Sequence, residues 1–460
     1  MGSSLLSNCG AATIQEMDAE LQKEYSHRAV WNIAAPMILS WISVPLLGLV
    51  DTAVVGHLEG PEYLAAVAAG AAIFSVLFAG LNFLRMGTTG VAAQAFGARD
   101  DQAINASLLQ PLLLAIALTL TLLVLREPLK NLGLNLLAPS VLVADYTEIY
   151  FDIRIWSAPA MLINLVMLGW LLGMQYARAA LVMILVINLS NIALDLWFVL
   201  GLGWNVDGVA RATVIAEYMG TVTGFCYVYR ILCSGATVRV NKELLRLTGF
   251  QRLIAINGNL FMRSVALMFT FAFITAQGAR IGDATLAANA VLMNFLYFFA
   301  YATDGLANAA EALTGKAVGS RNADALKLAV DQTMKWGIAF MIGFVLLYGI
   351  TGEHIIALLT NIDDVRATAS IYLPWLVLLP LASVVCFLYD GVYVGTTRSR
   401  EMMIVMLLSV LLVFLPTWFL LRELGNHALW AALFLFMALR SLGMHIWFRR
   451  MQQQRRLIPA

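Results

Sequence analysis

Two stretches of the sequence place carboxylate side chains inside long apolar runs. The first, Pro36–Gly60, is long enough to cross a bilayer and carries Asp51 among apolar and small residues. A charge at membrane depth is costly, so a carboxylate retained there usually faces a cavity or a charged partner. The plainer alternative is that Asp51 marks the outer end of the span, close to His57 and Glu59. We therefore treat Asp51 as a candidate functional group.

The second stretch, residues 179–201, carries Asn191 and Asp195, which share a helix face because they are four residues apart. Asn188 lies near that face, and Thr213 on the next apolar run offers a hydroxyl that completes a polar cluster. Simpler interpretations stay open. A threonine in a membrane helix often donates to its own i−4 carbonyl, and an aspartate can hydrogen-bond between helices.

Two carboxyl groups in a partly dehydrated pocket cannot both be ionised cheaply, so one of them is expected to bind a proton that can load and leave. A site built from Asp51 and Asp195 therefore suits a proton relay. The same carboxylates, with the oxygens of Asn191 and Thr213, could equally hold a sodium ion. The sequence alone leaves proton and sodium coupling both open, and no organic cofactor is expected.

The first span is also a candidate for bending. Pro36 and Pro45 each remove a backbone donor and clash with the preceding turn of the helix. A bend in this span would move Asp51 relative to its neighbours.

The composition indicates a polytopic α-helical membrane protein. Of the 460 residues, 61% are hydrophobic and 12% are charged, and the mean hydropathy is +0.80. A soluble domain carries about twice that charged fraction. The apolar runs are continuous rather than alternating, which disfavours a β-barrel. The net charge of +1 and the lack of a basic tract give no support to nucleic-acid binding.

The apolar runs predict twelve transmembrane helices, and Lys and Arg gather in alternate loops and in the tail. This bias puts both termini in the cytoplasm. The expected organisation is a cytoplasmic segment 1–28, an N-lobe 29–233, a cytoplasmic loop 234–252, a C-lobe 253–450 and a cytoplasmic tail 451–460. The predicted spans are 30–55, 63–97, 104–126, 145–175, 179–201, 208–233, 253–280, 284–318, 330–350, 367–396, 402–421 and 427–448.

The two halves of the chain repeat one another at a constant offset of 222 residues. QAFGAR at Gln94–Arg99 matches KAVGSR at Lys316–Arg321, and Gly169 matches Gly391. Because the offset spans six helices, both copies have the same orientation in the membrane. They should be related by an axis along the membrane normal, with the transport path between them.

The repeat makes the differences between the halves informative. Asp51 falls opposite Phe273, and Asp195 falls opposite Thr417. If these carboxylates were structural parts of the repeat, both halves would be expected to keep them. The asymmetry favours a functional role for the carboxylates of the first half.

The second half has deep carboxylates of its own. Asp304 and Asp390 are candidate transport groups of the C-lobe, whereas Arg154 in the first half opens its span and is expected at the membrane interface. These assignments rest on depth along the predicted spans.

Enzyme functions find no support in the sequence. The five histidines lie near span ends without an HExxH arrangement, and no Gly-x-Ser-x-Gly or Walker A motif is present. The four cysteines show no paired metal spacing. Without an ATPase motif, any pumping must be driven by an ion gradient.

Several longer motifs can be matched to a family. They are PLLGLVDTAVVGHL in the first span, LRMGTTGVAAQAFGAR after the second, GWLLGMQYAR in the fourth, NLSNIALD in the fifth, and YDGVYVGTTR and GNHALW in the second half. Together they resemble the DinF branch of the MATE (multidrug and toxic compound extrusion) transporters over nearly the whole chain. The resemblance implies an inner-membrane antiporter of twelve helices in two six-helix lobes.

The resemblance also implies roles for individual positions. The family's first-helix aspartate falls on Asp51, and the proline whose bending accompanies its protonation falls on Pro36. The fifth-helix Asn-x-x-x-Asp falls on Asn191 and Asp195, and the sixth-helix threonine falls on Thr213. The supporting residues of the same N-lobe cavity are expected to include Asn188, Asn164 and Tyr150. Another branch of the family has a glutamate in the seventh helix, which the seventh span here lacks.

We therefore expect a proton-coupled multidrug exporter of the bacterial inner membrane, acting as a monomer by alternating access on cationic or lipophilic drugs. Sodium coupling at the same site is the alternative within transport. A lipid or lipid-linked flippase is the alternative from a second class. It would need a cavity ringed by several arginines and lysines, and only Arg85, Arg211 and Arg263 lie deep here.

Overall fold

The computed structural model describes residues 21–56, 60–235 and 247–458. Most of the predicted cytoplasmic segment 1–28 and of the predicted loop 234–252 lies outside these residues, as do the last two residues of the predicted tail. The described residues are almost entirely helical and contain no β-strand, which confirms the all-α fold class.

The first half of the chain forms the helices α2 His27–Val55, α3 Pro61–Ala79, α4 Phe83–Ala98, α5 Asp101–Val124, α6 Arg126–Leu137, α7 Val141–Arg154, α8 Ala158–Gly173, α9 Ala177–Asp195 and α10 Val206–Gly235. Single 3₁₀ turns join α3 to α4 at Gly80–Asn82 and α7 to α8 at Ile155–Ser157. Each of these helix pairs therefore corresponds to one predicted span. The 12-residue helix α6 lies outside the predicted spans except for its first residue, Arg126, which ends the predicted span 104–126.

The second half forms the helices α11 Leu247–Ile281, α12 Asp283–Gly319, α13 Ala323–Leu359, α14 Asp363–Gly395, α15 Ser399–Ser409, α16 Leu415–Leu421 and α17 Asn426–Gln453. A π-helical turn at Val410–Phe414 joins α15 to α16 within the eleventh predicted span. Pro416 is the second residue after this turn and, without a backbone N–H, cannot donate to the Leu412 carbonyl within it. The proline therefore accounts for the irregular turn.

Ten helical segments of the described chain are long and apolar enough to cross a membrane, judged by length and composition. They correspond to ten of the twelve predicted spans. The first and sixth predicted spans correspond to α2 and α10, which have 29 and 30 residues. At a rise of about 1.5 Å per residue, both helices exceed the roughly 30 Å of a bilayer core.

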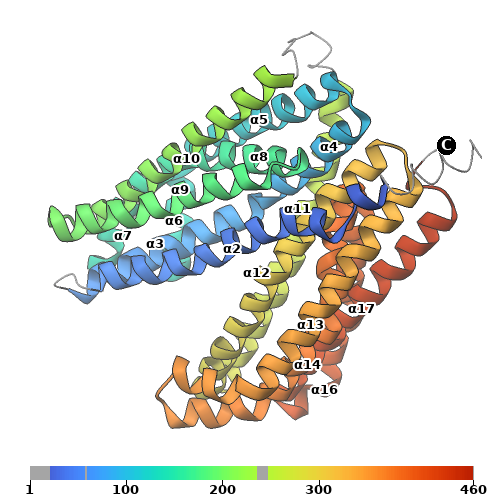
Figure 1. Cartoon of the computed structure of the whole chain (residues 1–460). Coiled ribbons are helices and arrows are strands. Elements are labelled where there is room, and N and C mark those ends of the chain that lie inside the picture. The colour runs from blue at the N-terminus through green and yellow to red at the C-terminus, as the bar shows by residue number, and fades with distance from the viewer. Residues whose placement is uncertain (1–20, 57–59, 236–246, 459–460) are drawn as a thin grey trace, which may run out of the picture.

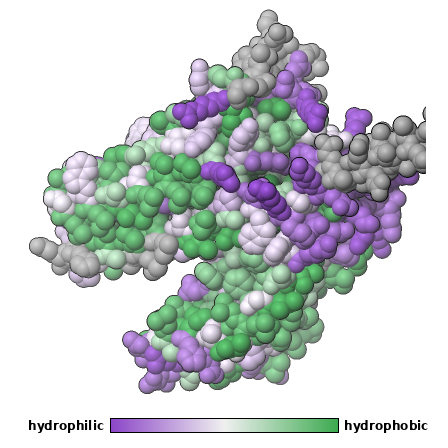
Figure 2. Space-filling view, viewed as in Figure 1, coloured by the Kyte–Doolittle hydropathy of each residue, from purple (hydrophilic) through white to green (hydrophobic). Residues whose placement is uncertain are grey.

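The helices form two arms that meet at one end and diverge toward the other (Figure 1). The first arm contains α2–α10, and the second contains α11–α17. The start of α2 and the end of α17 both lie near the joined end. Apolar residues cover the middle of both arms, whereas polar residues gather near the joined end and at the free tip of the second arm (Figure 2). This distribution is expected for helices that cross a bilayer.

Equivalent turns in the two halves share one backbone conformation. Arg99 and Arg321, which are 222 residues apart, are left-handed with φ of 53° and 55°. The residue after each caps the next helix, because Asp100 and Asn322 each accept a backbone N–H three residues further on, at 3.0 and 2.9 Å. Left-handed backbone is uncommon for residues with a Cβ atom, so its recurrence supports the internal repeat.

Glycines bring helices of each half together backbone to backbone. A Cβ atom built on Gly169 of α8 would lie 2.4 Å from the Arg85 carbonyl oxygen in α4. One built on Gly391 of α14 would lie 2.1 Å from the Ala307 carbonyl oxygen in α12, at the same offset in the sequence. Close approach of this kind requires small residues, which commonly set helix packing in membranes. In both arms, a glycine at the equivalent position therefore lets two helices pack backbone to backbone.

The joined end is closed by matching segments of the repeat. A Cβ atom on Gly97 would lie 2.0 Å from the Lys316 carbonyl oxygen, and one on Gly319 would lie 2.0 Å from the Gln94 carbonyl oxygen. The contacts are reciprocal, since the glycine of each arm meets the carbonyl of the other. Gln94 also donates from Nε2 to the Gly395 carbonyl at 2.9 Å. The arms therefore meet here without intervening side chains.

Because this contact leaves no room for a methyl group, Gly97→Ala is expected to open the joined end. Overpacking of this kind costs about 1–3 kcal/mol. A Thr397→Cys reporter lies at the joint, where Thr397 accepts from Gln94 at 3.2 Å. In a background without other cysteines, a water-soluble maleimide should label it about fivefold faster or more in Gly97→Ala. Gly343→Ala is the control, because a Cβ atom there has nothing within 4 Å. Equal labelling rates in the two variants would contradict this account of closure.

Candidate functional site

The carboxyl groups of Asp51 and Asp195 meet between α2 and α9. Asp51 lies one turn before the end of α2, and Asp195 is the last residue of α9, directly before the π-helical turn Leu196–Gly201. The two side chains lie near enough to interact electrostatically and to hydrogen-bond when one of them carries a proton. Asp195 is fully buried and Asp51 is partly buried. Asp51 therefore contacts the polar cluster rather than only marking the end of its span.

Asn191 links Asp195 to Thr213 of α10. With its amide oriented to match its neighbours, Asn191 donates from nitrogen to Asp195 Oδ2 at 2.9 Å, and its oxygen accepts from the Thr213 hydroxyl at 3.1 Å. The same hydroxyl lies 3.0 Å from the i−4 carbonyl of Val209, the alternative partner for a helical threonine. The structure thus brings Asn191, Asp195 and Thr213 together beside Asp51.

One oxygen of the carboxyl pair lacks a donor. Oδ1 of Asp195 is buried and has no hydrogen-bond partner within the described part of the chain. A buried acceptor left unpaired costs about 1–3 kcal/mol. Two carboxylate oxygens cannot bond each other unless one carries a proton, because an ionised carboxylate only accepts. A proton shared by Asp51 and Asp195 would satisfy this oxygen and join the two side chains.

Arg154 brings a positive charge to the pair. It interacts electrostatically with Asp51 and Asp195, and it hydrogen-bonds Tyr150 one turn earlier on α7. Its guanidinium also lies 5.5 Å from the ring centre of Phe74. Arg154 was predicted to lie at the membrane interface, so its contact with the pair was not predicted. The i, i+4 spacing of Tyr150 and Arg154 on one helix was the available signal.

Asn164 belongs to a neighbouring cluster between α8 and α10. Its Nδ2 donates to Glu217 Oε2 at 2.8 Å, and its oxygen accepts from the Thr221 hydroxyl at 2.9 Å. Glu217 also interacts electrostatically with Arg154, which connects the two clusters. Glu217 was not among the predicted site residues. A carboxylate in the middle of the apolar run 208–233 is the same kind of signal that singled out the first span.

Asn188 connects α9 to the proline segment of α2 rather than to the carboxyl pair. Its Nδ2 donates to the Ser43 hydroxyl at 2.7 Å, and that hydroxyl donates to the Ser40 carbonyl at 2.6 Å. The Ser40 hydroxyl in turn donates to the Pro36 carbonyl at 2.9 Å. A polar chain therefore runs from α9 to Pro36.

The second arm packs against the same segment of α2. A Cβ atom on Gly305 of α12 would lie 2.9 Å from the Ile38 nitrogen and 3.1 Å from the Ala34 carbonyl oxygen, on either side of Pro36. A change of the α2 bend at this point would press on α12 or withdraw from it. Bending at Pro36 itself stays a prediction.

Asp390 of the second arm is held by two arginines. Arg440 donates from Nη2 to both of its carboxylate oxygens, at 3.0 and 3.2 Å, and Arg263 forms a further ion pair with it. All three side chains are buried. Asp390 is thus charge-compensated in this structure, and its role in transport stays a prediction, as does that of Asp304.

A cavity of about 370 Å³ lies between the arms. The charged residues on its wall are Asp304, Glu311 and Asp390 with Arg85 and Arg263. Arg85 reaches across from α4, with its Nη1 3.8 Å from Glu311 Oε2 on α12. The cavity thus carries both signs of charge. Its aromatic wall consists of Trp41, Phe271, Tyr297, Tyr301 and Phe387. Within the described ranges, no group of three or more His, Cys, Asp or Glu side chains is arranged to hold a metal ion.

The family of the chain follows from its two halves together. The MatE family model matches residues 36–197 and matches again at residues 260–419, once in each arm. The chain therefore belongs to the MATE family of membrane transporters. Family membership also confirms that the protein is a transporter and not an enzyme.

Two curated relatives show how the chain stands within the family. DNA damage-inducible protein F of Escherichia coli strain K12 is 46% identical over 430 residues, which are 92% of each chain. Multidrug resistance protein MdtK of Edwardsiella ictaluri is 25% identical over 445 residues, 93% of this chain and 96% of the relative. The first of these confirms the predicted resemblance to the DinF branch.

Solved structures of MATE proteins share the fold. One described as MATE in the bent conformation has a TM-score of 0.83 at 19% identity, covering 94% of this chain and 97% of that one. Another, described as MATE in the straight conformation, has a TM-score of 0.82 at 19% identity, covering 94% and 98%. At this identity the likeness shows the fold alone, and it confirms the twelve-helix arrangement.

The asymmetry of the repeat gives a test of the cluster. Asp195→Asn keeps the size of the side chain but removes its proton site, so drug export should fall at least about tenfold. Thr417→Val changes the equivalent position of the second arm and should leave export nearly unchanged. The resistance of cells to a fluorescent cationic drug, compared at equal protein levels, measures the export activity of both variants. Similar losses in the two variants would show that the coupling groups are not confined to the first arm.

Proposed function

We propose that the chain is a multidrug exporter of the bacterial inner membrane, driven by the proton gradient, with Asp51 and Asp195 as its coupling groups. With one proton, the two carboxyl groups bond each other. Without it, two negative charges face each other and attract a cationic compound in its place. Proton and drug then compete for one site, and their exchange across the membrane is antiport.

The contact between Asp51 and Asp195 is the observation that carries this proposal. It joins two helices. A proton shared with Asp51 would give the unpaired Oδ1 of Asp195 the hydrogen-bond donor that it lacks. Arg154 lies near enough to steady the pair when the proton leaves. The site is thus compatible with both states that a proton-coupled cycle requires.

Sodium coupling at Asp51, Asn191, Asp195 and Thr213 is the alternative, since their oxygens suit a hard cation. One feature favours the proton. Arg154 already brings a positive charge to the same place, and a second fixed cation would be repelled.

The cavity between the arms, which Asp51 and Asp195 do not line, favours cationic and lipophilic substrates that pass through it before they reach the carboxyl pair. Aromatic rings line it beside the carboxylates of Asp304 and Glu311, a combination that attracts aromatic cations. A flippase for anionic lipids would need a cavity of mainly positive charge. Here Arg85 and Arg263 are balanced by Asp304, Glu311 and Asp390. The charge balance favours drug export over lipid transfer.

Orientation and movement complete the proposal. If both termini are cytoplasmic, as the Lys and Arg bias predicts, the joined end faces the cytoplasm and the arms open outward. We infer that loss of charge at Asp51 lets α2 repack around Pro36 against α12. The bent and straight structures of MATE relatives are consistent with such a movement. A monomer suffices, because one chain supplies both arms.

Vesicles containing the purified protein and ethidium, a fluorescent cation, test the proposal. A proton gradient alone should drive ethidium transport, and a sodium gradient alone should not. Asp51→Asn should reduce proton-driven transport at least about tenfold. Asp283→Asn, an exposed carboxylate in the first turn of α12, is the matched control and should transport normally.

If a sodium gradient alone drives transport, sodium and not the proton is the coupling ion. If Asp51→Asn transports at the full rate, Asp51 is not a coupling group. In the same vesicles, Pro36→Ala should weaken the dependence of drug release on pH. An unchanged pH midpoint and rate in that variant would rule out bending at Pro36 as the coupling step.

A further inference from the structure

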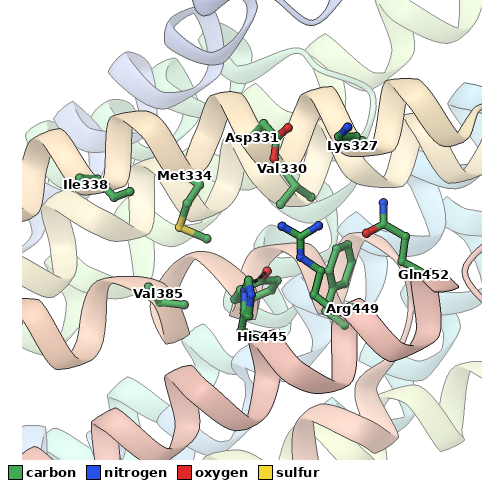
Figure 3. A pocket seen from close by; sticks show the side chains of 11 residues that line it. Lys327, Val330, Asp331, Met334, Ile338, Val385, His445, Arg449 and Gln452 are labelled. Carbon is green, nitrogen blue, oxygen red and sulfur yellow. Dashed lines mark hydrogen bonds between the residues drawn. The ribbon is translucent and has the colours of Figure 1, made fainter.

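A crevice of about 190 Å³ lies on the surface of the second arm, between α13 and α17 and against α14 (Figure 3). Its polar end is formed by Lys327 and Asp331 of α13 and by Arg449 and Gln452 of α17. Lys327, Asp331 and Arg449 are exposed. In Figure 3 the Arg449 side chain points into the space between the two helices, on the side where Lys327 and Gln452 also lie.

The other end of the crevice is apolar. Along α13, the residues that line it are Lys327, Asp331, Met334 and Ile338, which recur every three or four positions on one helix face. The face changes from charged to apolar over about 16 Å of helix. Val385 of α14 continues the apolar wall, and Ile338 is 43% exposed. This order matches that of a phospholipid, with its headgroup at the polar end and an acyl chain along the apolar end.

We propose that this crevice binds one glycerophospholipid with an anionic phosphodiester and a hydroxyl-bearing headgroup, as in phosphatidylglycerol. Lys327 and Arg449 contribute two positive charges and Asp331 one negative charge, so a lipid of charge −1 makes the site neutral. The phosphate pairs with Lys327 and Arg449. Asp331 accepts a hydrogen bond from a headgroup hydroxyl, which a choline headgroup cannot donate.

The position of the crevice supports an anionic lipid. Its polar end belongs to the first turns of α13 and the last turns of α17, and α13 begins directly after the joined-end segment Lys316–Arg321. On the predicted orientation this is the cytoplasmic side, where basic pockets between membrane helices bind anionic headgroups. A bound lipid would connect α13 to α17, both of which pack on α14. The site is separate from the carboxyl pair, and its occupancy does not depend on drug export.

Native mass spectrometry of the purified full-length protein tests the proposal, with phosphatidylglycerol and phosphatidylcholine as probes. Phosphatidylglycerol should bind at least about tenfold more tightly than phosphatidylcholine. Lys327→Gln and Arg449→Gln should each reduce this preference about fivefold, and the double variant should remove it. Arg450→Gln is the matched control, because it removes the same charge from the next position of α17 but does not line the crevice. It should leave the preference unchanged.

Three results would overturn the proposal. The first is an Arg450→Gln variant that loses as much preference as Arg449→Gln, and the second is a double variant that keeps the preference, since general surface charge would then attract the lipid. The third is water-soluble glycerophosphate binding as tightly as the intact lipid, because the apolar wall would then contribute nothing. Weak binding of glycerophosphate, together with an unchanged lipid preference in Arg450→Gln, would support the lipid site.

Discussion

Two carboxyl groups that face each other in a site largely shielded from water cannot both be charged without an electrostatic cost. Asp195, which is buried, and Asp51, which is partly buried, are in this arrangement at the junction of α2 and α9. With a proton between them they hold the two helices together. Without one they repel, unless a cation enters or Arg154 compensates. The packing of α2 against α9 is therefore tied to the protonation of one site, which is the property that an ion-coupled transporter requires.

The effect of this site on the rest of the molecule passes through α2. The same helix contacts Gly305 of α12 around Pro36, close to the turn that Asn188 reaches through Ser43. α12 continues from there to Gly319 at the joined end, where the two arms meet backbone to backbone. A continuous set of packed elements thus connects the carboxyl pair to the contact that holds the arms closed. We infer that a shift of α2 is felt at the joined end because these contacts leave no free space to absorb it.

Much of this arrangement could be predicted from the sequence. Continuous apolar runs define the spans, and the constant offset defines the repeat, because both signals are local or periodic. The spacing of Asn191 and Asp195 placed them on one helix face, and the position of Asp51 inside an apolar run singled it out. Thr213 offered a hydroxyl on the next apolar run, and the resemblance to MATE proteins pointed to the same four positions. The structure brings these four together.

The rest could not be predicted, because it depends on how each helix is rotated about its axis. Arg154 lies near enough to the carboxyl pair to interact with it electrostatically. Asn164 hydrogen-bonds Glu217, and Asn188 hydrogen-bonds Ser43, so these two asparagines do not bond the carboxyl pair. The salt bridges of Asp390 likewise join helices far apart in sequence. No pattern along one helix specifies such partners.

The sharing of one proton by Asp51 and Asp195 is most directly tested by infrared difference spectroscopy of the purified protein. The carbonyl stretch of a protonated carboxyl group is separate from that of a carboxylate, so the proton can be observed without transport. If Asp51 and Asp195 share a proton, the protein should show a protonated carboxyl band that disappears when ethidium binds at constant pH and that is absent from Asp51→Asn. A band that ethidium leaves unchanged, or that persists in both Asp51→Asn and Asp195→Asn, would show that the two groups do not share a proton.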